Sequence, residues 1–348
     1  MIRRSRAIAV VALSLLFPTI EAAAVGVQRA FVASTGSDTA NCQIATPCRS
    51  FGAAITKTLS GGEVIVLDSA GYGPVIIGTS VSIVAPPGVY AGISVVSGNG
   101  ITVEAPGATV VLRGLSINGL GGTHGILAQH AARVQIENCV VSHMGGAAIY
   151  HGAPGGDVIV LDTIVRDNVD GVAVVSSDGQ IVLDHVRSER NQNSGFYIAP
   201  VFGSIGNAFA VIVDSLFTNN RGNGIWIDTV SGAFTIAKVE RSVVTNNGGD
   251  GFKVTSGAGI AQVTLGRSTI GGGDPAVDVI APTGTVFATL SGNIVTDGRI
   301  LVTGAGAVVY VSGNTGQTLA CIDSPTVYVF GNNTLTEGAL CGTKVGLD

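Results

Sequence analysis

The chain has 348 residues, of which 51 are glycine, 12% are charged and 5% are aromatic, and its formal net charge at pH 7 is −5. A protein that binds the phosphates of nucleic acid needs a basic surface, so this charge argues against a nucleic-acid partner. Abundant glycine, together with recurring valine, isoleucine and threonine, favours strands and turns over long helices.

The first 24 residues predict a signal peptide. A basic start at residues 3–6 is followed by an apolar stretch at 7–17 and by three alanines at 22–24, which are typical of a cleavage site. The apolar stretch is shorter than the roughly 20 residues that a membrane-spanning helix needs. We therefore expect an exported protein that is secreted, periplasmic or at the cell surface, with no transmembrane segment in the mature chain.

The spacing of the five cysteines predicts two local disulfides, which form in an oxidising compartment. Cys42 and Cys48 lie six residues apart, and Cys321 and Cys341 lie twenty apart. The fifth, Cys139, occupies a position that is polar in other repeats, and we interpret it as a buried, inert thiol. The cysteines and histidines do not have the spacing of a zinc site.

Residues 25–63 predict an N-terminal cap. The best helix candidate of the mature chain is the segment 47–59, which the disulfide between Cys42 and Cys48 would hold over the first coil. Such a cap is expected because the end of an open parallel sheet exposes unpaired backbone groups. At the other end, residues 336–348 predict a C-terminal tail or cap.

Residues 64–335 contain an internal repeat. A glycine that precedes a short apolar strand recurs at positions 171, 195, 224 and 251, at intervals of 24, 29 and 27 residues, and each unit also contains a second strand and an asparagine-rich turn. This period predicts a solenoid, and the two-strand pattern favours an all-β parallel β-helix of about 12 coils. Stacking of the coils would place four asparagines in a ladder of side-chain amides: Asn168, Asn191, Asn220 and Asn247.

One outward column of this repeat contains the only tryptophan of the chain and two of its six tyrosines. If the strand residue after the repeat glycine points inward, the next residues point outward in the order Leu127, Tyr150, Ala173, Tyr197, Trp226, Lys253 and Asp278. Exposed rings beside hydrogen-bonding groups suit sugar rings. The candidate substrate-binding residues are therefore Tyr150, Tyr197, Trp226, Asp228 and Lys253. Alternatively, these rings cover strand backbone or pack under a loop such as 199–207.

A second column contains carboxylates. Asp162, Asp184 and Asp214 are predicted to stack on successive coils, with neighbours about 5 Å apart and alternate ones about 10 Å apart, which brackets the spacing in glycosidases. The same groups would suit Ca²⁺, although the sequence assigns no metal ligand and no other cofactor. Alternatively, they are turn residues that cap backbone N–H groups. His151 is a further catalytic candidate because it is expected beside the aromatic column, and a structural histidine is the alternative.

The repeat pattern, and the front segment 31–38 followed by Pro47, Cys48 and the helix candidate, resemble the pectate-lyase-like superfamily of right-handed parallel β-helix proteins, in particular its exported bacterial branch. The resemblance implies a right-handed β-helix over nearly the whole mature chain. It implies no single activity, because this scaffold carries lyases, hydrolases, epimerases and non-catalytic surface proteins. The catalytic motifs of its pectate lyases and polygalacturonases are incomplete here, so it implies no catalytic residue.

Three functional hypotheses follow from the sequence. The first is an exported protein that contacts extracellular polysaccharide through the aromatic column, with catalysis left open. The second is a non-catalytic, adhesin-like or structural surface protein. The third is a polysaccharide lyase or hydrolase that uses Asp162, Asp184 and Asp214.

Overall fold

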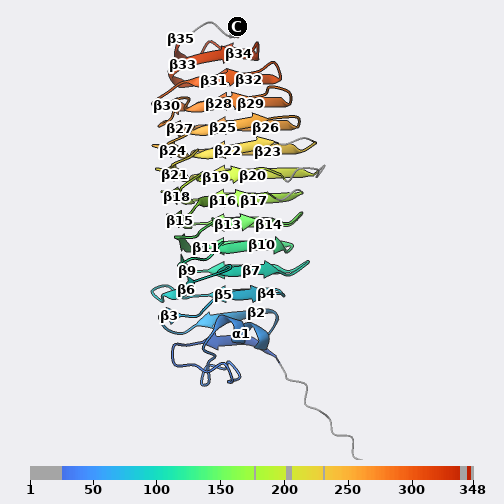
Figure 1. Ribbon diagram of the computed structural model, residues 1–348, viewed down its shortest axis with the longest axis vertical. Helices are drawn as coiled ribbons and strands as arrows, with labels where there is room; N and C mark the ends of the chain where they lie inside the picture. The colour runs from blue at the N-terminus through green and yellow to red at the C-terminus, as the bar shows by residue number, and fades with distance from the viewer. Residues whose placement is uncertain (1–25, 176–177, 201–205, 230–231, 338–342, 346–348) are drawn as a thin grey trace, which may run out of the picture.

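The structure is a computed structural model, and it describes residues 26–175, 178–200, 206–229, 232–337 and 343–345. Short strands stack along one long axis into a rod, and the single labelled helix, α1, lies at the N-terminal end (Figure 1). The predicted signal peptide lies outside the described residues.

Three parallel sheets form the walls of the rod, and most coils contribute one strand to each. The first sheet contains, in spatial order, β1 (Val27–Val32), β2 (Thr58–Val66), β5 (Val81–Val84), β8 (Thr109–Arg113), β11 (Arg133–Glu137), β14 (Asp157–Leu161), β17 (Gly179–Asp184), β20 (Asn207–Val213), β23 (Phe234–Glu240), β26 (Ile260–Gly266), β29 (Thr285–Ser291), β32 (Ala307–Ser312), β34 (Thr326–Phe330) and β36 (Thr343–Val345). Twelve of these strands, β2 to β34, belong to the predicted repeat region, so the prediction of about 12 coils is confirmed.

In each coil the strand of the second sheet comes directly before the strand of the first sheet along the chain, as β13 (Ala147–His151) does before β14. The second sheet contains β4 (Val75–Ile77), β7 (Ile101–Glu104), β10 (Ile126–His130), β13 (Ala147–His151), β16 (Asp170–Val174), β19 (Phe196–Ile198), β22 (Ile225–Thr229), β25 (Phe252–Ser256), β28 (Val277–Ile280) and β31 (Ile300–Thr303).

The third sheet consists of shorter strands. It contains β3 (Ala70–Gly71), β6 (Ala91–Val95), β9 (Leu115–Gly119), β12 (Val140–Ser142), β15 (Ile164–Arg166), β18 (Arg187–Glu189), β21 (Leu216–Thr218), β24 (Val243–Thr245), β27 (Thr269–Ile270) and β30 (Ile294–Val295). Near the C-terminus β33 (Thr315–Ile322) pairs with both β30 and β31, and β35 (Thr334–Glu337) pairs with β33. The two sheets therefore join at β33.

The core is a stack of apolar side chains enclosed by the three sheets. Successive strand residues alternate between the interior and the surface, so that in β22 Ile225 and Ile227 are fully buried while Trp226 and Asp228 are half-buried on the outside. The predicted inward positions of the second sheet are all fully buried: Ile126, Ile149, Val172, Phe196, Ile225 and Phe252. Burying each such side chain stabilises the rod by about 1.5–3 kcal/mol.

The predicted asparagine ladder is present at the corner between the third and second sheets. The Nδ2 atoms of Asn168, Asn191 and Asn220 donate to the Oδ1 atom of the next asparagine at 3.1, 2.9 and 3.0 Å. Each acceptor oxygen also receives a backbone N–H of the preceding coil, as in the 3.0 Å bond from Asn191 N to Asn220 Oδ1. The ladder satisfies buried turn groups that would otherwise lose their hydrogen bonds to water.

The N-terminal cap is built around a helix shorter than the predicted 47–59 segment. α1 spans Phe51–Lys57, and the side chain of Ser50 caps it by accepting from Ala53 N. The chain from Thr58 onward is strand β2 instead, because its residues pair with β1 and β5. The predicted disulfide between Cys42 and Cys48 is present, and both cysteines are fully buried.

The remaining cysteine predictions have two outcomes. Cys139 is a free thiol and is buried, as predicted. Burial raises its pKa to about 11, which disfavours the reactive thiolate form. Cys341 lies outside the described residues, so its pairing with Cys321 stays a prediction. Within the described part of the chain, no helix is long and apolar enough to cross a membrane.

Candidate functional site

The strand register of the second sheet brings the predicted outward column together. Leu127 pairs with Tyr150, Tyr150 with Ala173, and Ala173 with Tyr197. The line continues from Tyr197 through Trp226 and Lys253 to Asp278. We call the outer surface of β13, β16, β19, β22, β25 and β28, with its flanking side chains, the aromatic face. Its rings are half-buried, so part of each reaches solvent.

Two rings at the centre of the aromatic face contact each other. The centroids of Tyr197 and Trp226 lie 4.8 Å apart with an angle of 47° between their planes. The indole Nε1–H of Trp226 donates to Thr255 Oγ1 at 3.1 Å, and the Thr255 hydroxyl donates to Asp228 Oδ1. These bonds fix the orientation of the indole, so the two rings form one platform.

A second ring contact lies two coils nearer the N-terminus and includes His124, a residue outside the predicted set of binding residues. His124 stacks on Tyr150 with centroids 4.5 Å apart, and its Nδ1 accepts a hydrogen bond from Ala147 N at 3.1 Å. The ring proton is therefore on Nε2, and burial lowers the pKa of His124, which keeps the imidazole neutral at pH 7. The sequence signal for His124 is its position directly before Gly125, the repeat glycine of that coil.

Asp170 is a second addition to the predicted set. It opens β16, between the coils of Tyr150 and Tyr197, and its carboxylate accepts long hydrogen bonds from Ser194 N and Asn193 Nδ2 at 3.4 and 3.5 Å. Burial is the main cause that raises the pKa of Asp170. The carboxyl group retains acceptor capacity that these two weak bonds do not use.

The C-terminal end of the aromatic face is a charged cluster around Lys253. Its ammonium lies 2.7 Å from Asp250 Oδ2 and 3.5 Å from Asp278 Oδ2. Burial alone would lower the pKa of Lys253, but the two carboxylates raise it above its usual value. Asp278 is 5% exposed, its Oδ1 has no hydrogen-bond partner, and burial followed by the charge of Asp250 raises its pKa.

The expectation that His151 lies beside the aromatic column is wrong. His151 follows Tyr150 in β13, so it points to the opposite side of the strand, and only 2% of it is exposed. Its register neighbours are Ala128 and Val174 in the interior. Burial lowers the pKa of His151 to about 4, so the side chain is a neutral core residue.

The predicted carboxylate column is wrong at Asp184. Asp162 and Asp214 occupy left-handed turn positions with φ of 47° and 48°, but in the intervening coil this position belongs to His185, with φ of 54°. Asp184 is the last residue of β17 and pairs with Leu161 and Val213. Relative to the predicted alignment of the repeats, β17 is shifted by one residue, because Ile181 and Leu183, rather than Val182, fill the core.

Of the two carboxylates that remain in that column, Asp214 is engaged by an arginine. Asp214 receives Arg241 Nε and Nη2 at 2.8 and 2.7 Å, and these hydrogen bonds hold the pKa of Asp214 below its usual value. Ligand atoms of Asp184, His185 and Asp214 lie within 4.8 Å of one another, the one such grouping among the described residues. Calcium prefers oxygen ligands without a competing guanidinium, so this arrangement fits the ion poorly.

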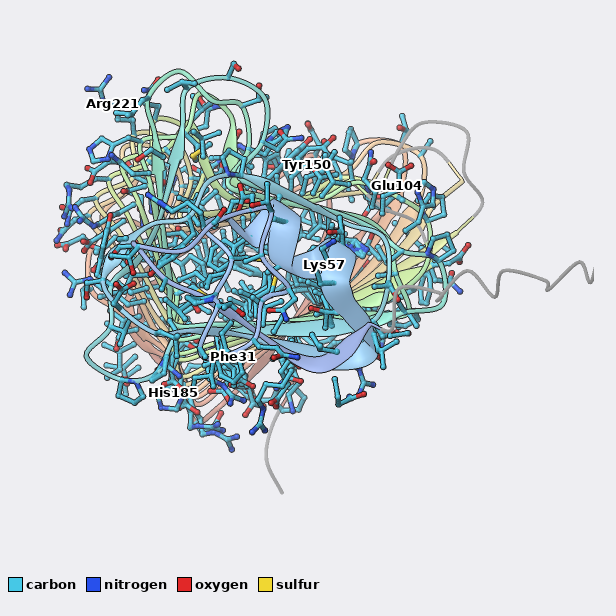
Figure 2. The ribbon with its side chains drawn as sticks, turned by 90° about the horizontal axis from the view of Figure 1, so that it is seen from below. Phe31, Lys57, Glu104, Tyr150, His185 and Arg221 are labelled. Carbon is cyan, nitrogen blue, oxygen red and sulfur yellow. A yellow bond between two sulfur atoms is a disulfide. The ribbon has the colours of Figure 1, made fainter. Side chains whose placement is uncertain are left out.

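The two candidate surfaces lie on different walls of the rod. Seen along the long axis, Tyr150 and His185 are on opposite sides of the molecule (Figure 2). A ligand on the aromatic face therefore has no contact with Asp184, His185 or Asp214.

The fold and this sheet order define a parallel β-helix protein. The chain belongs to the family described as the right handed beta helix region, whose profile matches residues 91–270. No curated protein matches the sequence.

Three solved structures illustrate the similarity. A pectate lyase is 16% identical, with 90% of this chain and 79% of that chain covered and a TM-score of 0.54. A rhamnogalacturonan lyase is 14% identical, with coverage of 84% and 82% and a TM-score of 0.57. The A-module of a mannuronan C-5 epimerase from Azotobacter vinelandii is 14% identical, with coverage of 82% and 91% and a TM-score of 0.53. The predicted resemblance to pectate-lyase-like β-helix proteins is thereby confirmed for the fold.

Proposed function

We propose that the protein binds extracellular polysaccharide along the aromatic face. The observation that carries this proposal is the ring pair of Tyr197 and Trp226, held at 4.8 Å and oriented by the bond from Trp226 to Thr255. Rings that are oriented and half-exposed present apolar surface on which a sugar ring can stack, while nearby polar groups accept its hydroxyl protons. Asp228 supplies such a group next to Trp226.

The similar structures support the same ligand class. Their names refer to pectate, rhamnogalacturonan and mannuronan, all of which are polysaccharides. A ligand running along the rod axis would meet the Tyr150, Tyr197 and Trp226 rings in turn, because the register places them in one line. Lys253 and Asp228 would contact it at the C-terminal end of this line.

The structural alternative and the catalytic alternative receive less support. The loop that would cover the rings in a purely structural protein, 199–207, lies partly outside the described residues, and the rings that are described are half-buried rather than buried. A lyase or hydrolase built on Asp162, Asp184 and Asp214 needs aligned, available carboxylates, whereas Asp184 is out of line and Asp214 is bound by Arg241.

The proposed location is outside the cytoplasm. A buried disulfide between Cys42 and Cys48 is consistent with folding in an oxidising compartment. The basic and apolar start of the chain agrees with export, and an extracellular location would bring the aromatic face into contact with polysaccharide.

Loss of the central ring tests the proposed function. Binding to a panel of neutral and acidic polysaccharides is measured by isothermal titration calorimetry for the natural protein and for Trp226→Ala. We expect the variant to bind more weakly by about 1–3 kcal/mol. The matched control is Phe209→Ala, because Phe209 is a 36% exposed ring on the first sheet, away from the aromatic face. Equal affinities of Trp226→Ala and the natural protein would contradict the proposal.

A further inference from the structure

The charges on the aromatic face are unbalanced. Its described side chains include one ammonium group, that of Lys253, and four carboxyl groups: those of Asp170, Asp228, Asp250 and Asp278. His124 adds no positive charge at pH 7, since its Nδ1 accepts a backbone hydrogen bond and burial keeps the ring neutral. A ligand on this face therefore meets an acidic surface.

The single ammonium is already neutralised within the protein. Lys253 lies between Asp250 and Asp278 at 2.7 and 3.5 Å, and its side chain is 24% exposed. Two carboxyl groups thus share one cation, and Asp278 Oδ1 remains without a partner. A carboxylate of a ligand placed here would compete with both aspartates for Lys253 and be repelled by them.

The other cations lie outside the column. Arg299, beyond the end of the face, lies 3.5 Å from Asp274. Arg221 is exposed on the turn before β22 and sits at a corner of the rod, separate from Tyr150 (Figure 2). Neither lies in the register line of rings on which a sugar would stack.

The available groups instead suit sugar hydroxyls. Carboxylate oxygens are strong acceptors for O–H donors, and Asp228 and Asp170 offer them beside Trp226 and between the coils of Tyr150 and Tyr197. Apolar rings with flanking acceptors match a polymer that carries hydroxyl groups and no acidic groups.

We propose that the aromatic face selects uncharged glycans and discriminates against polyuronates, through repulsion from Asp170, Asp228, Asp250 and Asp278. This inference rests on the proposed function and names its substrate class. The carboxylates act through both attraction and repulsion: they accept hydrogen bonds from hydroxyls and disfavour ligand carboxylates.

The test uses pairs of ligands that differ only in one group of each sugar, a carboxylate in the acidic member and a hydroxymethyl group in the neutral member. Hexasaccharides of galacturonate, mannuronate and glucuronate are each compared with their carboxyl-reduced, neutral counterparts at pH 7, by titration of the fluorescence of Trp226, the only tryptophan of the chain. In each pair of hexasaccharides that binds, we expect the neutral member to have a dissociation constant at least about tenfold lower than that of the acidic member at 0.01 M salt. The ratio of the two dissociation constants should become smaller at 0.15 M salt, because the Debye length falls from about 30 Å at 0.01 M to about 8 Å.

A matched variant connects the preference to the named carboxylates. In the double variant Asp170→Asn and Asp228→Asn the neutral members should retain most of their affinity, because amide oxygens still accept hydrogen bonds, whereas the acidic members should bind more tightly than before. As a control, Asp214→Asn changes a carboxylate on a different wall and should leave the preference unaltered.

The outcomes separate this inference from the proposed function. Tighter binding of an acidic member that is lost on Trp226→Ala, as measured by isothermal titration calorimetry, would overturn the charge preference while leaving polysaccharide binding on the aromatic face intact. Loss of acidic-glycan binding on Arg221→Ala would likewise overturn it and assign recognition to that corner. If no member of any pair binds, and the wider panel also fails to bind, both proposals fall.

Discussion

Tyr197 and Trp226 are direct register partners on β19 and β22, and their rings lie 4.8 Å apart. Because each ring contacts the other, loss of Tyr197 should change both the binding surface and the environment of the indole. Tyr197→Ala should weaken polysaccharide binding by about 1–2 kcal/mol and shift the emission of Trp226, as titration and emission spectra would record. Tyr197→Phe keeps the ring and should behave like the natural protein; equal losses in both variants would refute a stacking role.

Thr255 is expected to act as a positioning residue. It accepts a hydrogen bond from the indole of Trp226 and donates to Asp228, so Thr255→Val frees the indole without removing it. Binding should weaken by about 0.5–1.5 kcal/mol, less than for loss of the ring, and the fluorescence anisotropy of Trp226 should fall. An unchanged anisotropy would show that the bond to Thr255 does not orient the ring.

The asparagine ladder should contribute strongly to stability. Asn220 is 1% exposed, and its side chain receives both the backbone N–H and the Nδ2–H of Asn191 and donates to Asn247 and to Ser188 O. Asn220→Ala leaves these buried groups unsatisfied, so we expect a loss of about 2–4 kcal/mol in the free energy of unfolding, measured by denaturant titration.

The neighbouring asparagine provides a control for the ladder. Asn219 has a φ of 57°, a conformation that glycine adopts readily, so Asn219→Gly should change the free energy of unfolding by less than about 1 kcal/mol. Similar losses in the two variants would indicate that the turn, and not the amide ladder, is responsible.

The buried His151 predicts a pH dependence of stability. Burial lowers its pKa from 6.5 to about 4, so the unfolded chain binds this proton at a higher pH than the folded chain does. Stability is therefore unaffected by this group above pH 6.5 and falls by about 3 kcal/mol as the pH is lowered toward 4. Unfolding free energies of the natural protein and His151→Val across this range should differ in slope.

The comparison with the variant isolates this one group. Burial raises the pKa values of Asp170 and Asp278, and these groups act in the opposite direction, because the folded chain then binds their protons more readily than the unfolded chain. They are present in both proteins and cancel in the difference. Parallel stability profiles for the two proteins would exclude His151 as a source of acid sensitivity.

The disulfide between Cys42 and Cys48 should stabilise the N-terminal cap. The bridge closes a short loop, for which chain entropy gives about 2 kcal/mol. Both cysteines are fully buried, and Cys48 lies just before Ser50, which caps α1. The double variant Cys42→Ala and Cys48→Ala should show faster hydrogen exchange in α1 and β1, while strands near the middle of the rod keep their protection. Uniform exchange along the rod would show that the cap and the coils unfold as one unit.

Local patterns were sufficient to predict the fold and the aromatic column. The glycine and asparagine spacing predicted coils, and the alternation of residues in a strand placed Ile225 inside and Trp226 outside, as the structure has them. The asparagine ladder followed from the same spacing. These features depend on short-range periodicity, which is preserved whatever the ligand or activity.

The strand register between neighbouring coils, and the side-chain contacts that depend on it, could not be predicted from these local patterns. Alignment of similar residues in successive repeats predicts Asp184 in line with Asp162 and Asp214. In the structure Ile181 and Leu183 pack into the core, which shifts β17 by one residue relative to that alignment, so His185 occupies the turn position between Asp162 and Asp214. The helix also ends at Lys57, because Thr58 and the residues after it gain strand partners in β1 and β5.

The sequence by itself determined a β-helix with a line of aromatic residues along one wall, because repeat spacing and strand alternation are written in the order of residues. Only the tertiary structure decided which polar groups join that wall. Asp170 and His124 lie beside the rings, and Asp278 reaches Lys253, through contacts between neighbouring coils. Asp250, by contrast, pairs with Lys253 within one coil. Charge balance and burial depend on contacts between coils. The residues that make these contacts lie some 25 positions apart along the chain, so they leave no local pattern in the sequence.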